Sequence, residues 1–213
     1  MTVFRFAEDR LPFLKFVDKR DRSPVPSEDL LGRALPVHRV HTAAALTPGV
    51  AFATALDPAG QPTRVTALAF GYVHLPAERA QAVLTRVRQL GTAYLTFSTL
   101  AHAAKGDDDS CFWVVLPVTH PLTCEEHARA WRAFDSDLGG YADRRGRQPF
   151  TLVPRPSSPR ARLHRALYEA RDGLEVDVDA LLSGSRTLPD DDGPEPTAAP
   201  RAAGAALAAG GAP

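Results

Sequence analysis

The sequence has no run of 18 or more apolar residues, and it contains only two cysteines among its 213 residues. A membrane-spanning helix needs about 20 consecutive apolar residues, so the chain is not expected to cross a membrane. Residues 1–22 alternate aromatic and charged side chains and lack the apolar centre of a signal peptide. Two cysteines, Cys111 and Cys124, are too few for a disulfide framework, and both are expected to be buried thiols. These absences together favour a cytoplasmic protein.

Large apolar side chains are also almost absent from residues 183–213, which consist mainly of Ala, Pro, Gly and Asp. Such a segment buries too little surface to offset the entropy lost on ordering, so we expect a disordered tail. Residues 1–25 combine short apolar pieces with a charged stretch and are expected to form an N-terminal arm. The predicted organisation is therefore an arm (1–25), one folded domain (26–182) and a tail (183–213).

The net charge is zero, but the charges are unevenly distributed along the chain. Residues 129–171 contain ten arginines and four acidic residues, whereas residues 172–195 contain eight acidic residues and one arginine. The planar guanidinium group is the usual side chain for phosphate contact. The Arg-rich segment therefore favours a nucleic-acid partner, or an acidic tail that folds back onto it. A solvated Arg-rich surface is the simpler interpretation.

Strand and helix patterns alternate through the middle of the chain. Thr123 and Glu126 have the spacing of a helix capping box, and Gly91 and Gly139 are placed to end helices. The order of elements predicts an α+β domain with a strand-helix-strand unit among mostly antiparallel strands. Strands are expected at 37–46, 50–56, 63–70, 92–98, 111–116 and 150–153, and helices at 28–35, 76–90, 124–138 and 159–172.

A polar loop connects the two strands predicted at 92–98 and 111–116. Ser98, Thr99 and His102 stand where this loop begins. Polar side chains on a loop that a rigid sheet holds are common in binding sites. The loop also carries three consecutive aspartates at 107–109, which are either solvated or available as metal ligands.

Several sequence landmarks occur in a characteristic order, namely "FSTLAH", "CFWVVLPVTHPLTCEEHARAWRAF", "LGGYAD", "FTLVP" and "DGLEVDVDALL". In this order they resemble the archaeo-eukaryotic primase-polymerase domain of bacterial mobile elements. The resemblance spans residues 37–182 and is most specific at 114–143. It implies a mixed sheet flanked by helices, and a family activity of nucleotidyl transfer by two divalent metals in DNA replication.

The family's catalytic residues are largely missing at the matching positions of this chain. Its acidic metal pair corresponds to Gly71 and Val73, neither of which can bind a metal ion. Its phosphate-binding Ser-His pair corresponds to Ala101 and His102, and its basic residue in the next strand corresponds to Trp113. The resemblance therefore implies a degenerate, non-catalytic member, a pseudoenzyme that needs no cofactor.

An Ala-Asp pair of the family is retained as Ala142 and Asp143, and arginines follow it. The expected function is binding of nucleic acid or nucleotide through the basic face, without catalysis. The candidate binding residues are Ser98, Thr99, His102, Asp143, Arg144, Arg145 and Arg147.

Two alternatives remain. The domain could serve as a protein-interaction module, with a partner captured by the aromatic arm. It could instead be an active nucleotidyltransferase whose Mg²⁺ or Mn²⁺ ligands have moved to aspartates 107–109. Among other residues, Trp113 and Trp131 are expected in the core, and His127 at the surface.

Overall fold

The computed structural model describes residues 11–16, 25–29, 39–41, 49–53, 63–103, 105–106, 108–149, 151–159 and 164–183. The predicted tail, apart from its first residue, and most of the predicted arm lie outside these ranges, while residues 11–16 of the arm form a strand. The strands are β1 (Leu11–Phe16), β2 (Val25–Asp29), β3 (Arg39–His41), β4 (Gly49–Ala51), β5 (Val65–Pro76), β6 (Tyr94–Ser98), β7 (Asp109–Leu122), β8 (Val153–Pro154), β9 (Ser157–Pro159) and β10 (Tyr168–Arg171). The helices are α2 (Ala77–Gln89), α3 (Cys124–Leu138), α4 (Val178–Ser183) and the 3₁₀ helix η1 (Arg144–Arg147).

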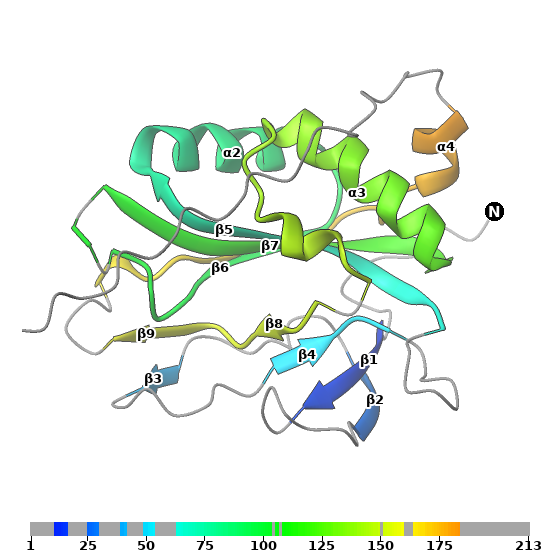
Figure 1. Cartoon of the computed structure of the whole chain (residues 1–213), viewed down its shortest axis with the longest axis horizontal. Coiled ribbons are helices and arrows are strands. Elements are labelled where there is room, and N and C mark those ends of the chain that lie inside the picture. Colours follow the sequence, from blue (N-terminus) through cyan, green and yellow to red (C-terminus); the bar gives the residue numbers. More distant parts are fainter. Residues whose placement is uncertain are drawn as a thin grey trace, which may run out of the picture.

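The described elements form three layers (Figure 1). A four-stranded sheet in the order β10-β6-β7-β5 occupies the middle, with α2 and α3 over one face. A second sheet in the order β2-β1-β4-β8 lies on the opposite side. The predicted α+β class is therefore confirmed.

Strands β5 and β6 and the helix α2 that connects them form a strand-helix-strand unit, and β7 lies between the two strands in the sheet. Both pair antiparallel with β7, so they run in the same direction with β7 between them and α2 as their connection. Parallel pairing among the described residues is limited to β3 with β9 and to two isolated bridges. The predicted strand-helix-strand unit is therefore present within a largely antiparallel arrangement.

Alternation of side chains along β5 divides the core into two parts. Leu68 and Phe70 pack in the larger cluster beneath the helices, whereas Ala67 and Ala69 pack in a smaller cluster between the two sheets. Successive side chains of a strand point to opposite faces, so a strand covered on both faces is apolar throughout. The smaller cluster also contains Val115 of β7. Both faces of the middle sheet are therefore covered.

The predicted ends of the two long helices are confirmed. The hydroxyl of Thr123 accepts a hydrogen bond from the backbone N–H of Glu126, whose carboxylate accepts one from the N–H of Thr123 at 2.7 Å. Gly139 ends α3 with φ 115°, and Gly91 follows α2 with φ 72°. Both glycines adopt the left-handed conformation that side chains disfavour.

Two predicted helices are wrong where the structure describes them. Residues 157–159 and 168–171 form strands β9 and β10 rather than one helix from 159 to 172. Residues 25–29 form β2, which pairs with β1 and includes the first residues of the helix predicted at 28–35. In each case pairing with a distant strand overrides the local pattern.

Three smaller predictions also need correction. Strand β7 continues past Pro117 to Leu122, because β6 pairs only as far as Val115 and proline is tolerated where a neighbouring strand ends. Cys124 is exposed, while Cys111 is buried as predicted, and neither forms a disulfide. His127 is buried on α3 rather than at the surface.

Among the described residues, no helix has the length and apolar character that a membrane crossing requires.

Candidate nucleotide- or nucleic-acid-binding pocket

A pocket opens where the core between the two sheets ends. Ala67 and Ala69 of β5 are covered by the second layer, but the next two residues on that face, Gly71 and Val73, line an open cavity. The cavity measures about 420 Å³, and Val73 is 49% exposed at its edge. This volume lies within the usual range for small-molecule sites. The pocket therefore lies at the edge of the core between the two sheets.

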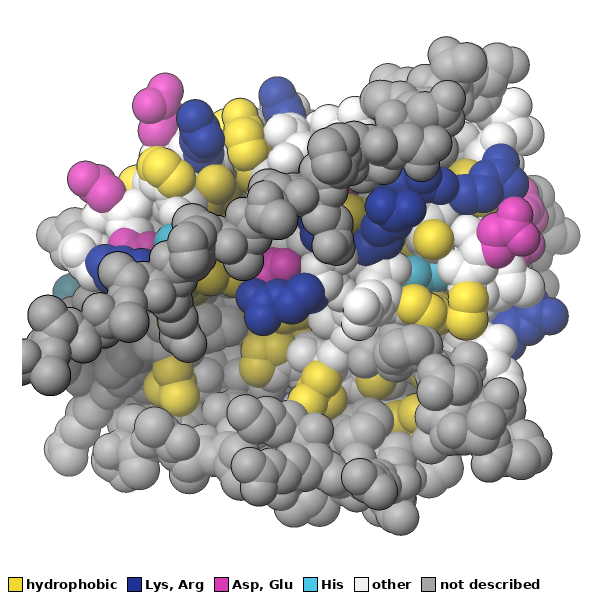
Figure 2. All heavy atoms as spheres, viewed as in Figure 1, with side chains coloured by type: hydrophobic (Ala, Val, Ile, Leu, Met, Phe, Trp, Pro, Cys, Tyr) yellow, Lys and Arg dark blue, Asp and Glu magenta, His cyan; other side chains and the backbone are white. Residues whose placement is uncertain are grey.

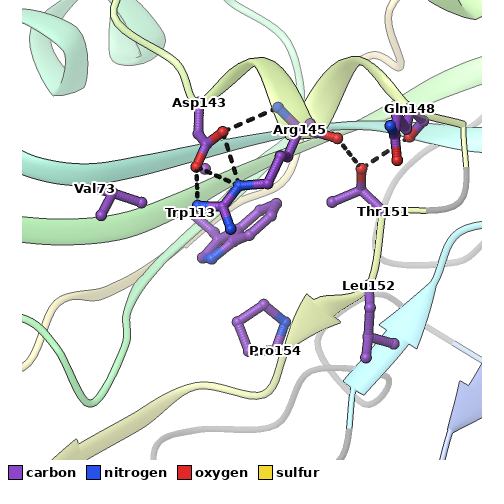
Figure 3. Close-up of a pocket in the computed structure, with 10 residues that line it drawn as sticks. Val73, Trp113, Asp143, Arg145, Gln148, Thr151, Leu152 and Pro154 are labelled. Atoms are coloured by element: carbon purple, nitrogen blue, oxygen red, sulfur yellow. Dashed lines mark hydrogen bonds and ion pairs between the residues drawn. The ribbon is translucent and has the colours of Figure 1, made fainter. Parts of the chain in front are cut away.

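Trp113 of β7 contributes an aromatic surface to the pocket (Figure 3). It is the direct cross-strand partner of Gly71, and its indole lies against that glycine. A Cβ atom added to Gly71 would lie 2.9 Å from the indole ring, closer than side chains normally approach. The ring is half-buried and also packs against the core cluster between the sheets. Gly71 therefore makes the space in which the indole lies.

The segment that follows α3 is attached to β5 by two hydrogen bonds from distant residues. The indole N–H of Trp131 donates to the carbonyl of Ala69 at 2.9 Å, and the backbone N–H of Asp143 donates to the carbonyl of Gly71 at 2.7 Å. Asp143 then caps η1 by accepting a hydrogen bond from the backbone N–H of Arg145 at 3.0 Å. These bonds place the side chains of Asp143 and Arg145 at the pocket.

Asp143 and Arg145 form a two-pronged ion pair above the indole of Trp113 (Figure 3). The guanidinium Nε lies 3.0 Å from one carboxylate oxygen, and Nη2 lies 2.5 Å from the same oxygen. The guanidinium lowers the pKa of Asp143, and the carboxylate raises the pKa of Arg145. Arg145 is 80% exposed, and its Nη1 has no partner among the described residues. That group is therefore available to an anionic ligand.

The remaining described lining comes from the chain between η1 and β8. Thr151 fixes this wall, because its hydroxyl donates to the carbonyls of Gln148, at 2.9 Å, and of Arg145. Leu152 and Pro154 supply apolar surface opposite Trp113 (Figure 3). In Figure 2, basic and acidic side chains stand side by side at the centre of this face, over apolar ones. The pocket is therefore apolar inside and charged at its rim.

The sequence-predicted binding residues divide into two groups. Asp143 and Arg145 line the pocket, while Arg144 and Arg147 lie in η1 beside it without lining it. Ser98, Thr99 and His102 do not line the pocket. They lie at the C-terminal end of β6 and in the loop that follows.

The residues of this second group have structural partners. The hydroxyl of Ser98 is buried and accepts a hydrogen bond from the backbone N–H of Leu167 at 3.0 Å. The N–H of Thr99 donates to the carbonyl of Cys111, whose own N–H donates to Nδ1 of His102 at 3.2 Å. Burial lowers the pKa of His102. These contacts hold the loop against β7.

Metal chemistry in the pocket is limited by its side chains. Of the ten described residues that line it, only Asp143 carries a carboxylate, and that carboxylate is paired with Arg145. Gly71 and Val73, where the resemblance predicts the family's acidic pair to lie, both line the cavity. Two-metal nucleotidyl transfer needs several oxygen ligands that hold two metal ions about 3.5–4 Å apart. The described lining does not supply such a set.

Another hollow, between α3 and α4, is larger at about 670 Å³ but is more acidic. Its described lining includes one guanidinium group, from Arg129, and three carboxylates, from Glu126, Asp177 and Asp179. Carboxylates repel phosphate groups, so this hollow is a poor site for a nucleic acid. The pocket at Trp113 fits such a ligand better.

Trp113 is a pocket residue that the sequence pattern assigned to the core. It alternates with Val115 on β7 and therefore shares the face of a buried residue. The sequence signal that could have distinguished it is a glycine, Gly71, at the cross-strand position. That relation depends on the register of two strands 42 positions apart, which local patterns do not specify.

No protein-family model matches the chain, and no curated protein matches it in sequence. Among solved structures, the chain is similar to the AEP domain (PP-N190) of the primase-polymerase (PrimPol) of cyanophage S-2L, with a TM-score of 0.44 and 10% sequence identity. The match covers 82% of this chain and 88% of that one. A likeness at this level concerns the path of the backbone and transfers neither residue roles nor activity.

Proposed function

We propose that this domain binds nucleotides or single-stranded nucleic acid in the pocket at Trp113 and does not join nucleotides. The observation that carries the proposal is an open cavity with a half-buried indole inside it and an exposed guanidinium at its rim. An indole offers a flat surface on which any base can stack, and a guanidinium contacts the phosphate backbone. The replication and mobile-element role that the family resemblance implies stays a prediction.

The pocket geometry supports stacking together with a backbone contact. Base stacking on an aromatic side chain contributes about 1–3 kcal/mol per base and has little sequence preference. Phosphate contacts with arginine release counterions, so binding should weaken steeply as salt increases. Base-edge recognition is not part of the proposal, because Asp143, Arg145 and Thr151 already bond within the protein, which leaves Gln148 as the remaining polar side chain of the described lining. The protein is therefore expected to recognise the phosphate backbone and the flat faces of the bases rather than a particular base sequence.

The side chains at the pocket support the proposed absence of catalysis. A reaction that needs two metals would have one paired carboxylate, Asp143, among the described lining residues. Primer extension by the full chain with Mg²⁺ or Mn²⁺ tests this part of the proposal. Templated extension above the background of a mock purification would contradict it.

Replacing Trp113 with alanine, or Arg145 with glutamine, should weaken binding of a labelled single-stranded oligonucleotide. We expect a loss of roughly 5- to 100-fold for Trp113→Ala, which removes the stacking surface, and of roughly tenfold for Arg145→Gln, with a salt slope smaller by about one. The measurement is fluorescence anisotropy of the full chain at several salt concentrations. Arg79→Gln is the matched control, because it removes one exposed arginine that lies on α2 against Tyr141. Absence of binding at low salt, or an equal loss in the control, would refute the proposed site.

Replacing Asp143 with asparagine should strengthen the same binding by roughly three- to tenfold. The amide oxygen can still cap η1, while the negative charge that pairs with Arg145 is removed. An anionic ligand then meets an unpaired guanidinium. The same titration with and without Mg²⁺ separates this result from metal binding, since a metal-ligating Asp143 would make the variant bind more weakly than the wild type only when Mg²⁺ is present.

A further inference from the structure

Three metal-binding side chains meet at the end of the middle sheet, near the start of α2. They are His74 of β5 and Asp109 and Cys111 of β7, and their ligand atoms all lie within 4.8 Å of one another. The distance from Nδ1 of His74 is 2.8 Å to a carboxylate oxygen of Asp109 and 3.8 Å to Sγ of Cys111. Cys111 is buried, whereas His74 is 40% exposed on its side chain. The cluster thus has a buried side and an open side.

The backbone around the cluster holds the three side chains in this arrangement. The register of β5 on β7 shifts between Tyr72 and Leu75, and His74 within this irregularity has φ 55°. This conformation brings the backbone N–H of His74 to 3.2 Å from the sulfur of Cys111. Such backbone geometry is rare for a residue other than glycine and persists only where its surroundings stabilise it.

Asp109 is oriented by the loop that precedes β7. Its second carboxylate oxygen accepts a hydrogen bond from the backbone N–H of Lys105 at 3.0 Å, and its carbonyl accepts one from Ala103 at 2.6 Å. Although burial alone would raise the pKa of Asp109, the bonds from His74 and Lys105 lower it. Groups behind a ligand that fix its orientation are typical of metal sites.

The arrangement does not fit a nucleophilic triad. In such a triad the acid and the nucleophile bond to the two different nitrogens of the histidine ring. Here the carboxylate and the sulfur both approach Nδ1 of His74. Three ligand atoms that converge on one point fit a shared cation better than a proton relay.

We propose that His74, Asp109 and Cys111 bind one divalent cation of the zinc class. Imidazole, carboxylate and thiolate are the ligand types that tetrahedral zinc takes, while magnesium and calcium prefer oxygen alone. Zinc–ligand distances of about 2.0–2.3 Å place tetrahedral ligands roughly 3.3–3.6 Å apart. The observed 2.8 and 3.8 Å bracket this range, and the third pair, a carboxylate oxygen of Asp109 and Sγ of Cys111, lies within 4.8 Å, so small shifts of the exposed imidazole and of the carboxylate admit the ion. The exposed side of His74 leaves the fourth position to water or a ligand.

This site differs in two ways from the relocated-ligand alternative raised by aspartates 107–109. Of the two described residues of that run, Asp109 contributes, and Asp108 is exposed outside the cluster. The other two ligands are nitrogen and sulfur, which do not suit the Mg²⁺ or Mn²⁺ of two-metal nucleotidyl transfer. The site is proposed to hold the loop before β7 against the end of β5 rather than to join nucleotides.

Cobalt titration of the full chain tests the proposal, because Co²⁺ substitutes for zinc and its thiolate complexes absorb in the near ultraviolet. The protein is first treated with chelator and kept reduced. We expect thiolate-to-cobalt absorption that saturates at about one ion per chain and is displaced by zinc. The two cysteines supply a matched pair, since Cys111→Ser should abolish the band and Cys124→Ser should retain it. No thiolate band in the wild type, or loss of the band in Cys124→Ser alone, would overturn the proposal.

Two further variants keep the test decisive if Cys111→Ser does not fold. Asp109→Asn and His74→Asn each remove a ligand, and asparagine tolerates the left-handed backbone of residue 74. Removing a group that only orients a metal ligand typically weakens metal binding by roughly 10- to 100-fold. Each of these variants removes a ligand itself, so each should weaken zinc binding by more than that. Asp108→Asn should leave zinc binding unchanged. Unchanged affinity in both ligand variants would show that the cluster is an ordinary His–Asp ion pair beside a buried thiol. None of these readouts uses nucleic acid, so they are independent of the function proposed for the pocket.

Discussion

Replacing Gly71 with alanine should lower the free energy of unfolding by about 1–3 kcal/mol, the usual cost of adding a methyl group where a packed neighbour must move. The added Cβ would lie 2.9 Å from the indole of Trp113, so the ring or the strand must move. Unfolding in urea, followed by circular dichroism, measures the change. Gly71→Asp should cost more, because a carboxylate would also be placed against an aromatic ring.

The matched control introduces Gly71→Ala into the Trp113→Ala background. With the indole gone the added methyl group has space, so most of the cost should disappear, giving a coupling energy of about 0.5–3 kcal/mol. An equal cost in both backgrounds would show that backbone freedom at Gly71, rather than contact with Trp113, is what matters. The expected coupling means that Gly71 and Trp113 act as one structural unit: a larger side chain is not tolerated at position 71 of β5 while the indole occupies that space.

Lowering the pH from 7 to 4 should destabilise the fold by about 3 kcal/mol through His127 alone. Burial lowers the pKa of His127 from 6.5 to about 4, and its Nδ1 has no hydrogen-bond partner among the described residues. The folded protein therefore resists protonation that the unfolded chain accepts. The stability is fully present above pH 6.5, declines as the pH falls towards 4, and is lost below that value; a difference of about 2.5 between the two pKa values corresponds to about 3 kcal/mol.

Urea unfolding at pH 7 and pH 4 checks this expectation when His127→Leu is compared with the wild type. Carboxylates with lowered pKa values, such as Asp143 and Glu169, also lose stabilising contacts on acidification, but they are common to both proteins. The variant should be close to the wild type at pH 7, because leucine replaces an unpartnered polar group. At pH 4 the free energy of unfolding of the variant should then exceed that of the wild type. Equal losses in the two proteins would place the acid sensitivity elsewhere.

Features set by neighbouring residues were predictable from the sequence. The capping box at Thr123 and the glycine ends of the two long helices depend on contacts three or four residues apart, and the structure shows them where the sequence placed them. The burial of His127 was also within reach. It lies four residues before Trp131 on α3, so it shares the helix face that the tryptophan buries.

Features set by distant contacts were not predictable from local patterns. Residues 168–171 carry a helix-like spacing of apolar side chains, yet they pair with β6 about 73 residues earlier. The carboxylate of Glu169 there binds Arg88 at 2.7 Å and also accepts from the hydroxyl of Tyr94. A strand that completes a sheet edge gains such contacts, and no window of neighbouring residues contains them.

The same limit applied to the candidate site. Asp143 and Arg145 were identified through a short motif, and both line the pocket. Ser98 was assigned to binding from its position after a strand, but its hydroxyl is used to hold the chain before β10. The pocket itself depends on how the two sheets are placed, since Gly71 of β5 and Pro154 of β8 both line it, and local sequence patterns do not specify that placement.

The hydrogen bonds that Trp131 and Asp143 make to β5 have a consequence for assembly. The carbonyls of Ala69 and Gly71 lie along the outer edge of the last strand in the middle sheet, where an extended segment of another chain would need them as acceptors. The indole and the amide already occupy both oxygens. Edge-to-edge growth into filaments or strand-exchanged dimers is therefore blocked at this stretch of β5, and the contacts that shape the pocket also protect the protein from aggregation.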